Sequence, residues 1–357
     1  MAPGGPPPEI RIDQLTGQRA LLAPGRAGRP REFEVPAAEP KPGAAESCPL
    51  CEGREDRTPP EFWANRPGGG EPDTPGWLQR SVPNLYAVLT GPDPEAATAR
   101  PAHDSGLTSS ADPLRSSARA SEPELFRTAS AHGAHEVIVN SPRHVASLAE
   151  LADAELAGAV AAWRVRMAAR AEDASFVHLC VNEGPLAGST LPHSHAQLFA
   201  LPFVPTEVAR ERERFTAYNE RTMGSHLLED VLVEEVRRRD RLVAIDGEAA
   251  LICPWASRSP YEMRLLPRSV EQRFERDERG GPLLGRALAA LAGRFGAVPQ
   301  LNLWVRTAPR GAAEFHWHID IAPRLSVRAG FELGTGIEIN SVAPEQAAAE
   351  LRESLPA

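Results

Sequence analysis

One pattern of residues occurs twice in this chain, and this duplication constrains the fold more than any other feature of the sequence. Each copy has a β-branched segment, a segment with apolar residues at helical spacing, a second apolar segment, and two histidines at alternate positions. The first copy starts at residues 135–139 and the second at residues 261–270. The sequence therefore predicts an α+β fold in which one strand–helix–strand–strand unit is present in two versions.

The two copies differ at the positions where chemistry would take place. His144 and Gln197 of the first copy correspond to Ser269 and Asp320 of the second. The first copy thus has the full set of polar residues, and we interpret the second as degenerate.

The histidines of the first copy follow a turn of small residues between two predicted strands, at residues 176–181 and 198–203. Residues two apart on a strand point to the same face, so two imidazoles and an amide should lie side by side. The backbone N–H groups of the turn could approach an anion such as a phosphate. An isolated His-x-His is also compatible with two exposed strand histidines. The turn residues are Gly188, Ser189 and Thr190, and the same-facing residues are His193, His195 and Gln197.

A Cys-x-x-Cys motif at Cys48 and Cys51 predicts half of a zinc site. Such a motif could also be redox-active or a surface turn, but proline, glycine and charged residues stand where a redox motif would have a strand and a helix. A structural zinc site needs two further ligands, which are commonly histidines. His144, at the end of the first predicted strand, and His193 complete a Cys2His2 set.

If His193 binds zinc, the neighbouring His195 remains free on the same face. A free imidazole can attack phosphorus as a nucleophile. Gln197 could hydrogen-bond the transferred phosphoryl oxygens, and Arg26 and Arg29 could stabilise the charge that develops. The sequence thus predicts phosphoryl-group chemistry at His195.

The composition argues against several other classes of protein. A net charge of -9 gives no electrostatic support for binding nucleic acid or a membrane surface. No apolar segment is long enough to span a membrane, and four cysteines in 357 residues do not make a disulfide scaffold, so we expect a cytoplasmic protein. Residues 91–121 are poor in apolar residues and rich in Pro, Ala, Ser and Asp, which predicts a disordered insertion.

The ordered series of motifs resembles the galactose-1-phosphate uridylyltransferase branch of the histidine-triad superfamily, which also contains ADP-glucose phosphorylase. The resemblance covers nearly the whole chain outside the insertion, and the common order of the motifs identifies the family better than any one of them. The motifs are Leu-Thr-Gly-Gln at 15–18, Pro-Gly-Arg-Ala-Gly-Arg-Pro at 24–30, Cys-Pro-Leu-Cys at 48–51, Arg-Ser-Val-Pro-Asn at 80–84, Ser-Pro-Arg-His at 141–144, Asn-Glu-Gly at 182–184, Pro-His-Ser-His-Ala-Gln at 192–197, Phe-His-Trp-His at 315–318 and Gly-Phe-Glu-Leu-Gly-Thr at 330–335.

This resemblance implies two histidine-triad-like halves that form a mostly antiparallel sheet with helices packed on it, in a homodimer. We place the half with the zinc site and the nucleophile at residues 1–205 and the degenerate half at residues 206–357. The resemblance also implies ping-pong chemistry, in which His195 takes a nucleotidyl group from a nucleotide sugar and Gln197 binds the phosphate. The other implied substrate contacts are Arg26, Arg29, Asn84, Asn182, Gly188, Ser189, Thr190 and Glu332, and the implied structural zinc ligands are Cys48, Cys51, His144 and His193.

We therefore expect a nucleotidyltransferase that moves UMP between a nucleotide sugar and a hexose 1-phosphate. The alternatives are an ADP-glucose-type or dinucleotide phosphorylase or hydrolase, with phosphate or water as the acceptor, and a non-catalytic nucleotide- or metal-binding protein. The sugar-binding tail differs from the galactose enzyme, which has lysine, phenylalanine and glutamine where this chain has Ser326, Val327 and Glu338, although Glu332 is kept. The tail is more similar to the phosphorylase branch.

Some members of the family hold a second metal ion with a glutamate and three histidines. Glu211, His316 and His318 match three of these ligands, and Arg306 stands at the fourth position. A guanidinium group offers no lone pair to a metal, so this departure argues against a second metal site. His316 and His318 could instead be hydrogen-bonded strand residues.

Overall fold

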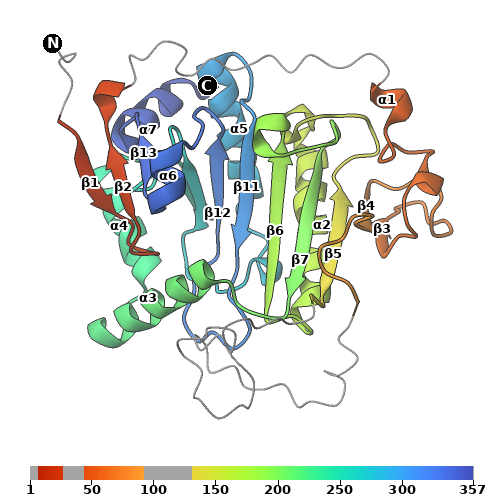
Figure 1. The fold of residues 1–357 in the computed structure, drawn as a ribbon, viewed down its shortest axis with the longest axis horizontal. Helices are drawn as coiled ribbons and strands as arrows, with labels where there is room; N and C mark the ends of the chain where they lie inside the picture. Colours follow the sequence, from red (N-terminus) through yellow and green to blue (C-terminus); the bar gives the residue numbers. More distant parts are fainter. Residues whose placement is uncertain (1–6, 27–43, 92–130, 357) are drawn as a thin grey trace.

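The computed structural model describes residues 7–26, 44–91 and 131–356. Within these residues, ten strands form one antiparallel sheet in the order β3-β4-β5-β7-β6-β11-β12-β10-β9-β8, and a smaller sheet has the order β1-β2-β13 (Figure 1). The strands are β1 (Glu9–Ile12), β2 (Arg19–Leu22), β3 (Trp63–Asn65), β4 (Gln79–Pro83), β5 (Ala134–Val139), β6 (Phe176–Glu183), β7 (His195–Leu201), β8 (Leu242–Ile245), β9 (Ala249–Ile252), β10 (Met263–Pro267), β11 (Leu301–Arg306), β12 (His318–Pro323) and β13 (Glu338–Asn340). The α-helices are α1 (Ala44–Ser47), α2 (Asp153–Ala171), α3 (Thr206–Thr222), α4 (Leu227–Arg238), α5 (Gly281–Phe295), α6 (Gly330–Thr335) and α7 (Pro344–Glu353). The predicted α+β class with a mostly antiparallel sheet is confirmed.

The duplication expected from the sequence is visible in the strand order. The segments β5-α2-β6-β7 and β10-α5-β11-β12 have the same order of elements along the chain. In the sheet, the order β6-β7-β5 on one side is matched by β11-β12-β10 on the other. Strands β6 and β11 join the two units, with Asn182 opposite Asn302. One sheet thus runs through both units, and the boundary between residues 205 and 206, which falls between β7 and α3, stays a prediction.

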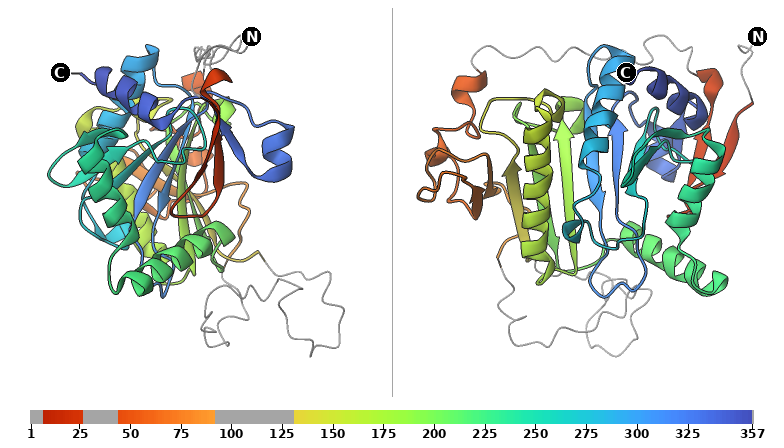
Figure 2. Two further views of the ribbon diagram at one scale, coloured as in Figure 1. Left: turned by 90° about the vertical axis from the view of Figure 1, so that its left-hand side faces the viewer. Right: turned by 180° about the vertical axis from the view of Figure 1, so that it is seen from behind.

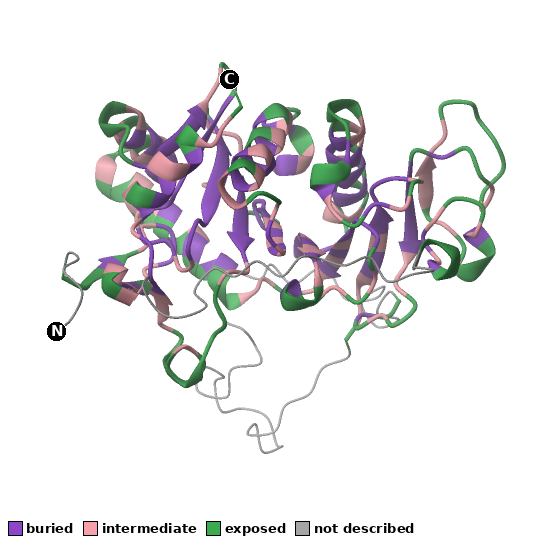
Figure 3. Cartoon of the chain, turned by 90° about the horizontal axis from the view of Figure 1, so that it is seen from above, coloured by how far each residue is buried: buried purple, intermediate pink, exposed green. Residues whose placement is uncertain are grey.

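Helices α2 and α5 lie side by side on one face of the large sheet (Figure 2). In α2 the buried apolar residues recur every three or four positions, as the helical pattern predicts. These residues share one core with α5 and with the inward-facing residues of β6, β7 and β11, so buried positions follow the strands and the inner faces of the helices (Figure 3). The members of this stripe on α2 are Leu156, Val160, Trp163 and Met167.

The opposite face of the sheet carries the polar residues of the central strands. On β7, Ala196 and Leu198 are buried in the core, so the alternating residues His195, Gln197 and Phe199 point to the other face. No helix among the described residues combines the length and the apolar character needed to cross a membrane. In the second unit, residues of α3 and α4 pack on β9 and β10 in a second apolar cluster. The candidate site lies in the first unit, on the face of β7 that carries His195 and Gln197.

The structure differs from the sequence prediction in a few places. Strand β7 begins at His195, so His193 lies before the strand and not within it. In the first copy, the segment with apolar residues at helical spacing, residues 148–171, is divided into a short 3-10 turn (Leu148–Glu150) and α2. Arg29 and residues 92–121 of the expected insertion lie outside the described residues.

Candidate active site

Four metal-ligating side chains meet next to the ends of β5 and β7. The sulfur of Cys48 lies 3.4 Å from Nδ1 of His193, and the sulfur of Cys51 lies 3.3 Å from Nδ1 of His144. The four ligand atoms all lie within 4.8 Å of one another. In the part of the chain that the structure describes, this is the one group of three or more such side chains with the geometry of a metal site. The predicted Cys2His2 set is therefore assembled and could hold a metal ion.

The surroundings of this cluster fit a bound cation. A backbone carbonyl can only accept, so Nε2–H of His193 donates to the carbonyl of Ser141 at 2.9 Å, and Nδ1 keeps its lone pair toward the cysteines. Burial and the neighbouring Cys48 raise the pKa of Cys51 to about 11. Two thiolates at this position need a nearby positive charge, which a metal ion supplies.

His195 is held in a single tautomer by the backbone. Its Nδ1 lies 2.7 Å from the carbonyl oxygen of His193, so Nδ1 carries the proton and Nε2 carries the lone pair. The residue is buried, and this burial lowers its pKa, which keeps the imidazole neutral. A neutral, oriented imidazole with a free Nε2 is the form required of a nucleophile.

A buried hydrogen-bond network fixes the backbone between the two histidines. The side chain of Asn140 donates to Ser194 Oγ at 3.0 Å and accepts from Trp163 Nε1 at 2.9 Å. The N–H of Ser194 donates to the carbonyl of Val145 at 2.6 Å. Asn140 and Trp163 therefore connect the His-Ser-His segment to helix α2, and the sequence analysis did not identify this role.

His135 links two of the predicted substrate contacts. Its Nε2 lies 3.0 Å from Oε1 of Gln197 and 3.1 Å from the side-chain nitrogen of Asn84. The ring stacks on Phe199 with a centroid distance of 4.1 Å. Asn84 and Gln197 thus come together through a histidine that the sequence analysis missed, while their role as substrate contacts stays a prediction. The one signal in the sequence was the position of His135 two residues before Val137, which puts both side chains on the same face of the strand.

Contacts from Gln300 and Asn302 of the second unit hold the small-residue turn in place. Gly184 has φ +85°, and a Cβ there would lie 2.4 Å from the side chain of Gln300, so only glycine fits. The side-chain nitrogen of Asn302 donates to Oδ1 of Asn182 at 2.7 Å and to the carbonyl of Ala187 at 2.8 Å. Because Val181 pairs with Ala196, the register places Asn182 beside His195. A residue of the second unit thereby orients the turn next to the nucleophile.

Two N–H groups of this turn are not free to bind an anion. The N–H of Gly188 donates to the carbonyl of Pro185, and the N–H of Ser189 donates to the carbonyl of Gly184. The hydroxyl of Ser189 donates to the carbonyl of Leu191 at 3.0 Å. The expectation that these backbone donors are available to a phosphate is therefore wrong for Gly188 and Ser189, while contacts from Thr190 remain a prediction.

Arg26 and Glu332 line a separate cavity of about 220 Å³ between β11, β12 and the segment around α6. Asn302 also lines this cavity, which connects it to the turn beside His195. The acidic residue that departs from the galactose enzyme, Glu338, is paired with Arg328 at 2.8 Å. The cavity is thus lined by the tail residues that were compared with the galactose enzyme, which are Ser326, Val327, Glu332 and Glu338. The charge of Glu338 is neutralised by Arg328.

These features define the class of the protein: an α+β protein in which two histidine-triad-like units share one sheet. The profile described as "Galactose-1-phosphate uridyl transferase, N-terminal domain" matches residues 105–205. The chain is 29% identical to ADP-glucose phosphorylase from Arabidopsis thaliana, over 97% of this chain and 93% of the relative. It is 27% identical to galactose-1-phosphate uridylyltransferase from Cryptococcus neoformans, over 97% of this chain and 90% of the relative.

The fold supports the same relationship. The crystal structure of ADP-glucose phosphorylase from Arabidopsis thaliana with bound ADP-glucose matches with a TM-score of 0.75 at 26% identity, covering 97% of this chain and 99% of that one. A uridylyltransferase structure matches in fold with a TM-score of 0.68, covering 97% and 98%. In sequence and in fold the chain is therefore similar to the galactose-1-phosphate uridylyltransferase family, and the names of these relatives support an enzyme of this kind.

Proposed function

We propose that this chain transfers a nucleoside monophosphate from a nucleotide sugar through a covalent intermediate on His195. The single observation that carries the proposal is the hydrogen bond from Nδ1 of His195 to the carbonyl of His193, because it leaves Nε2 as a neutral nucleophile on the strand face that also carries Gln197. Nε2 attacks the α-phosphorus, the bond from this phosphorus to the bridging oxygen breaks, and a sugar 1-phosphate leaves with that oxygen. In the second step an oxygen of the acceptor attacks the same phosphorus, and the N–P bond breaks.

Neighbouring side chains would stabilise the charge on the phosphoryl oxygens as it develops. Gln197 points to the same face as His195, and its carboxamide is oriented by His135. Asn182 is held beside His195 by Asn302. Preorganised donors of this kind are effective because they need no rearrangement during the reaction.

We assign zinc to the Cys2His2 cluster as a structural ion. Cys48, Cys51, His144 and His193 form a closed set of four ligands, which suits a structural site. When bound, zinc would supply a fixed anchor for the segment that carries His195. We also expect a homodimer in the cytoplasm, as the resemblance and the composition imply.

The acceptor has two candidates. Transfer of UMP to a hexose 1-phosphate is the expectation from the galactose enzymes. Inorganic phosphate is favoured by two observations: the likeness to an ADP-glucose phosphorylase in sequence and fold, and the replacement of the galactose enzyme's tail residues by Ser326, Val327 and Glu338. We therefore propose phosphorolysis of a nucleoside-diphosphate sugar as the second candidate function.

Intact-mass measurement against a panel of UDP-, ADP- and GDP-sugars tests the donor. The wild-type chain should gain the mass of one nucleoside monophosphate with at least one donor, and His226→Ala, which changes a partly exposed histidine paired with Glu314, should gain the same mass. No adduct with any donor would refute covalent transfer. Isotope from labelled phosphate that enters a nucleoside diphosphate identifies the phosphorylase, and isotope from a labelled hexose 1-phosphate that enters a nucleotide sugar identifies the transferase.

A further inference from the structure

The second unit contains a histidine with the same backbone hydrogen bond as His195. Nδ1–H of His318, the first residue of β12, donates to the carbonyl of His316 at 3.2 Å. The lone pair of His318 is therefore on Nε2. His318 is 1% exposed, compared with 8% for His195, and its Nε2 points toward Glu211 on helix α3.

Two buried carboxylates face this nitrogen. Oε1 of Glu211, on α3, lies 3.4 Å from Nε2, and Oδ2 of Asp320 lies 3.6 Å from it. Glu211 is 1% exposed, and its Oε1 has no hydrogen-bond donor among the residues that the structure describes. Two carboxylates and an imidazole lone pair in a buried space repel one another unless positive charge lies nearby.

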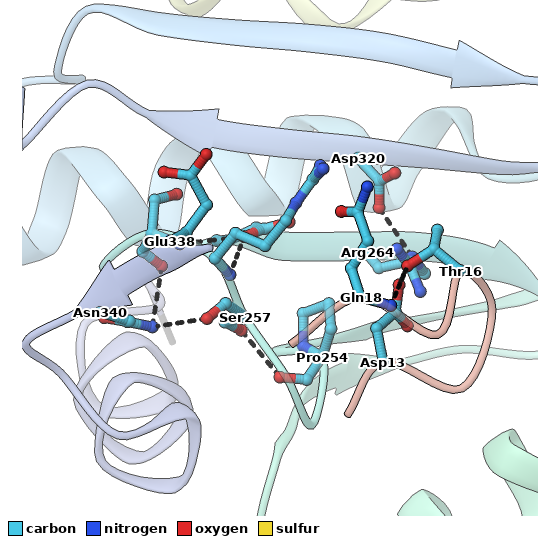
Figure 4. Close-up of polar contacts among 12 residues, drawn as sticks. Asp13, Thr16, Gln18, Pro254, Ser257, Arg264, Asp320, Glu338 and Asn340 are labelled. Carbon is cyan, nitrogen blue, oxygen red and sulfur yellow. Dashed lines mark hydrogen bonds and ion pairs between the residues drawn. The ribbon is translucent and has the colours of Figure 1, made fainter. Parts of the chain in front are cut away.

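Two arginines supply that charge from the neighbouring strands. Arg264 of β10 donates to Oδ1 of Asp320 at 2.7 Å, next to the β1–β2 turn that carries Asp13, Thr16 and Gln18 (Figure 4). Arg306 of β11 is paired in register with His318 and places its Nε 3.8 Å from Oε2 of Glu211. The guanidinium of Arg306 also donates to Glu207 at 3.1 Å. Arg264 and Arg306 together balance the two buried carboxylates.

We propose that the guanidinium group of Arg306 takes the place of a metal cation in this cluster. Glu211, His316 and His318 do not form a ligand set as they stand, because the geometry of a metal site is confined, within the described chain, to the Cys2His2 cluster. A divalent ion beside Glu211 would also be repelled by the adjacent guanidinium, at an energy that is large in a buried site. The second unit of the wild-type chain therefore binds no metal.

The same geometry assigns a latent cation site to this cluster. Residues directly opposite on paired antiparallel strands have Cβ atoms about 5 Å apart. Replacing Arg306 with histidine would remove the guanidinium and place a second imidazole beside His318, facing Glu211. Two imidazoles and a carboxylate are suitable ligands for zinc or cobalt. The Arg306→His variant should therefore bind one more divalent ion than the wild type.

Metal counting on the full-length protein tests this inference without reference to activity. Purified protein is saturated with cobalt, dialysed, and measured by elemental analysis and absorption spectroscopy. The wild type and Arg210→His, which adds an imidazole on the exposed side of α3 next to Glu211, should hold one ion with the thiolate charge-transfer band of the Cys2His2 cluster. Arg306→His should hold two, and its second ion should show no thiolate band. The added substitution Glu211→Gln should return the count to one.

Two results would overturn the inference. A wild-type chain with two ions, one of which is lost in Glu211→Gln, would show that Arg306 does not exclude the cation. A folded Arg306→His variant that stays at one ion would show that the cluster is not a latent site. If Arg306→His does not fold, the wild-type measurement still tests the inference, because a second ion that Glu211→Gln removes would contradict it. These outcomes are independent of the nucleotidyl-transfer assay.

Discussion

Replacing Glu136 with glutamine should destabilise the protein strongly, because this buried carboxylate is compensated by several donors. Glu136 on β5 is 0% exposed. Arg166 donates two hydrogen bonds of 2.9 Å to it, and Arg170 and Ser81 donate further ones. The substitution leaves the buried guanidinium of Arg166 without its counter-charge. Breaking a buried ion pair by removing one partner costs about 3–5 kcal/mol of the free energy of unfolding.

An exposed ion pair on α2, the helix that also carries Arg166, provides the matched control. Glu155 of α2 is paired with Arg143 at 2.7 Å, but their side chains are 33% and 54% exposed. An exposed pair of this kind contributes little because water and salt screen it, so Glu155→Gln should cost much less than Glu136→Gln. Urea unfolding of the wild type and both variants measures the two losses. A loss in Glu136→Gln no larger than in Glu155→Gln would refute the reasoning.

The pH dependence of the free energy of unfolding is a second test of the role of Glu136. Burial alone would raise the pKa of Glu136, but the hydrogen bonds and charge of Arg166 lower it below its ordinary value. A depressed folded-state pKa contributes stability above the unfolded-state pKa of about 4.3, and this contribution is lost as the pH falls through the folded-state pKa. The stability of the wild type should therefore fall more steeply in acid than that of Glu136→Gln.

Three further changes test the site. Asn140→Ala should cost about 1–3 kcal/mol in urea unfolding, because it leaves the buried indole N–H of the histidine network without an acceptor, and it should slow adduct formation. Cys51→Ser should lower the metal content from one ion per chain toward none, whereas Cys180→Ser, outside the cluster, should keep it. Gly184→Ala should cost about 1–3 kcal/mol because an L-residue is strained at φ +85°, whereas Gly68→Ala, with open space around its Cβ, should be close to neutral in a thermal melt.

Each of these expectations has a clear contrary result. An Asn140→Ala variant with wild-type stability and a wild-type rate of adduct formation would show that the Asn140 network does not support the histidine segment. Equal metal content in Cys51→Ser and the wild type would show that the Cys2His2 cluster does not bind the ion. Equal melting temperatures for Gly184→Ala and Gly68→Ala would mean that the turn tolerates a side chain.

The metal cluster and the general architecture could be predicted from the sequence because both depend on residue types at fixed spacings. Cys48 and Cys51 require two more ligands, and His144 and His193 are the histidines that the two predicted strand ends supply. The duplicated pattern likewise predicted two similar units, which the strand order repeats. These inferences needed no knowledge of which strands are neighbours.

The remaining features of the site depend on contacts between distant strands, which a one-dimensional pattern does not contain. Asn302 acts on the turn next to His195 because β6 and β11 pair in one particular register. His135 reaches Gln197 because β5 and β7 are neighbours. The availability of the Gly188 N–H could not be read from the small size of the turn residues, because the turn closes on itself.

Locating the covalent adduct on the chain tests the central claim most directly. The wild-type protein is incubated with the nucleotide sugar that labels it, digested under mildly alkaline conditions that preserve a phosphorus–nitrogen bond, and sequenced by tandem mass spectrometry. The nucleotidyl group should be on His195, it should be lost in acid, and His195→Ala should carry none. A nucleotidyl group on another residue, or an adduct of full yield in His195→Ala, would contradict the account.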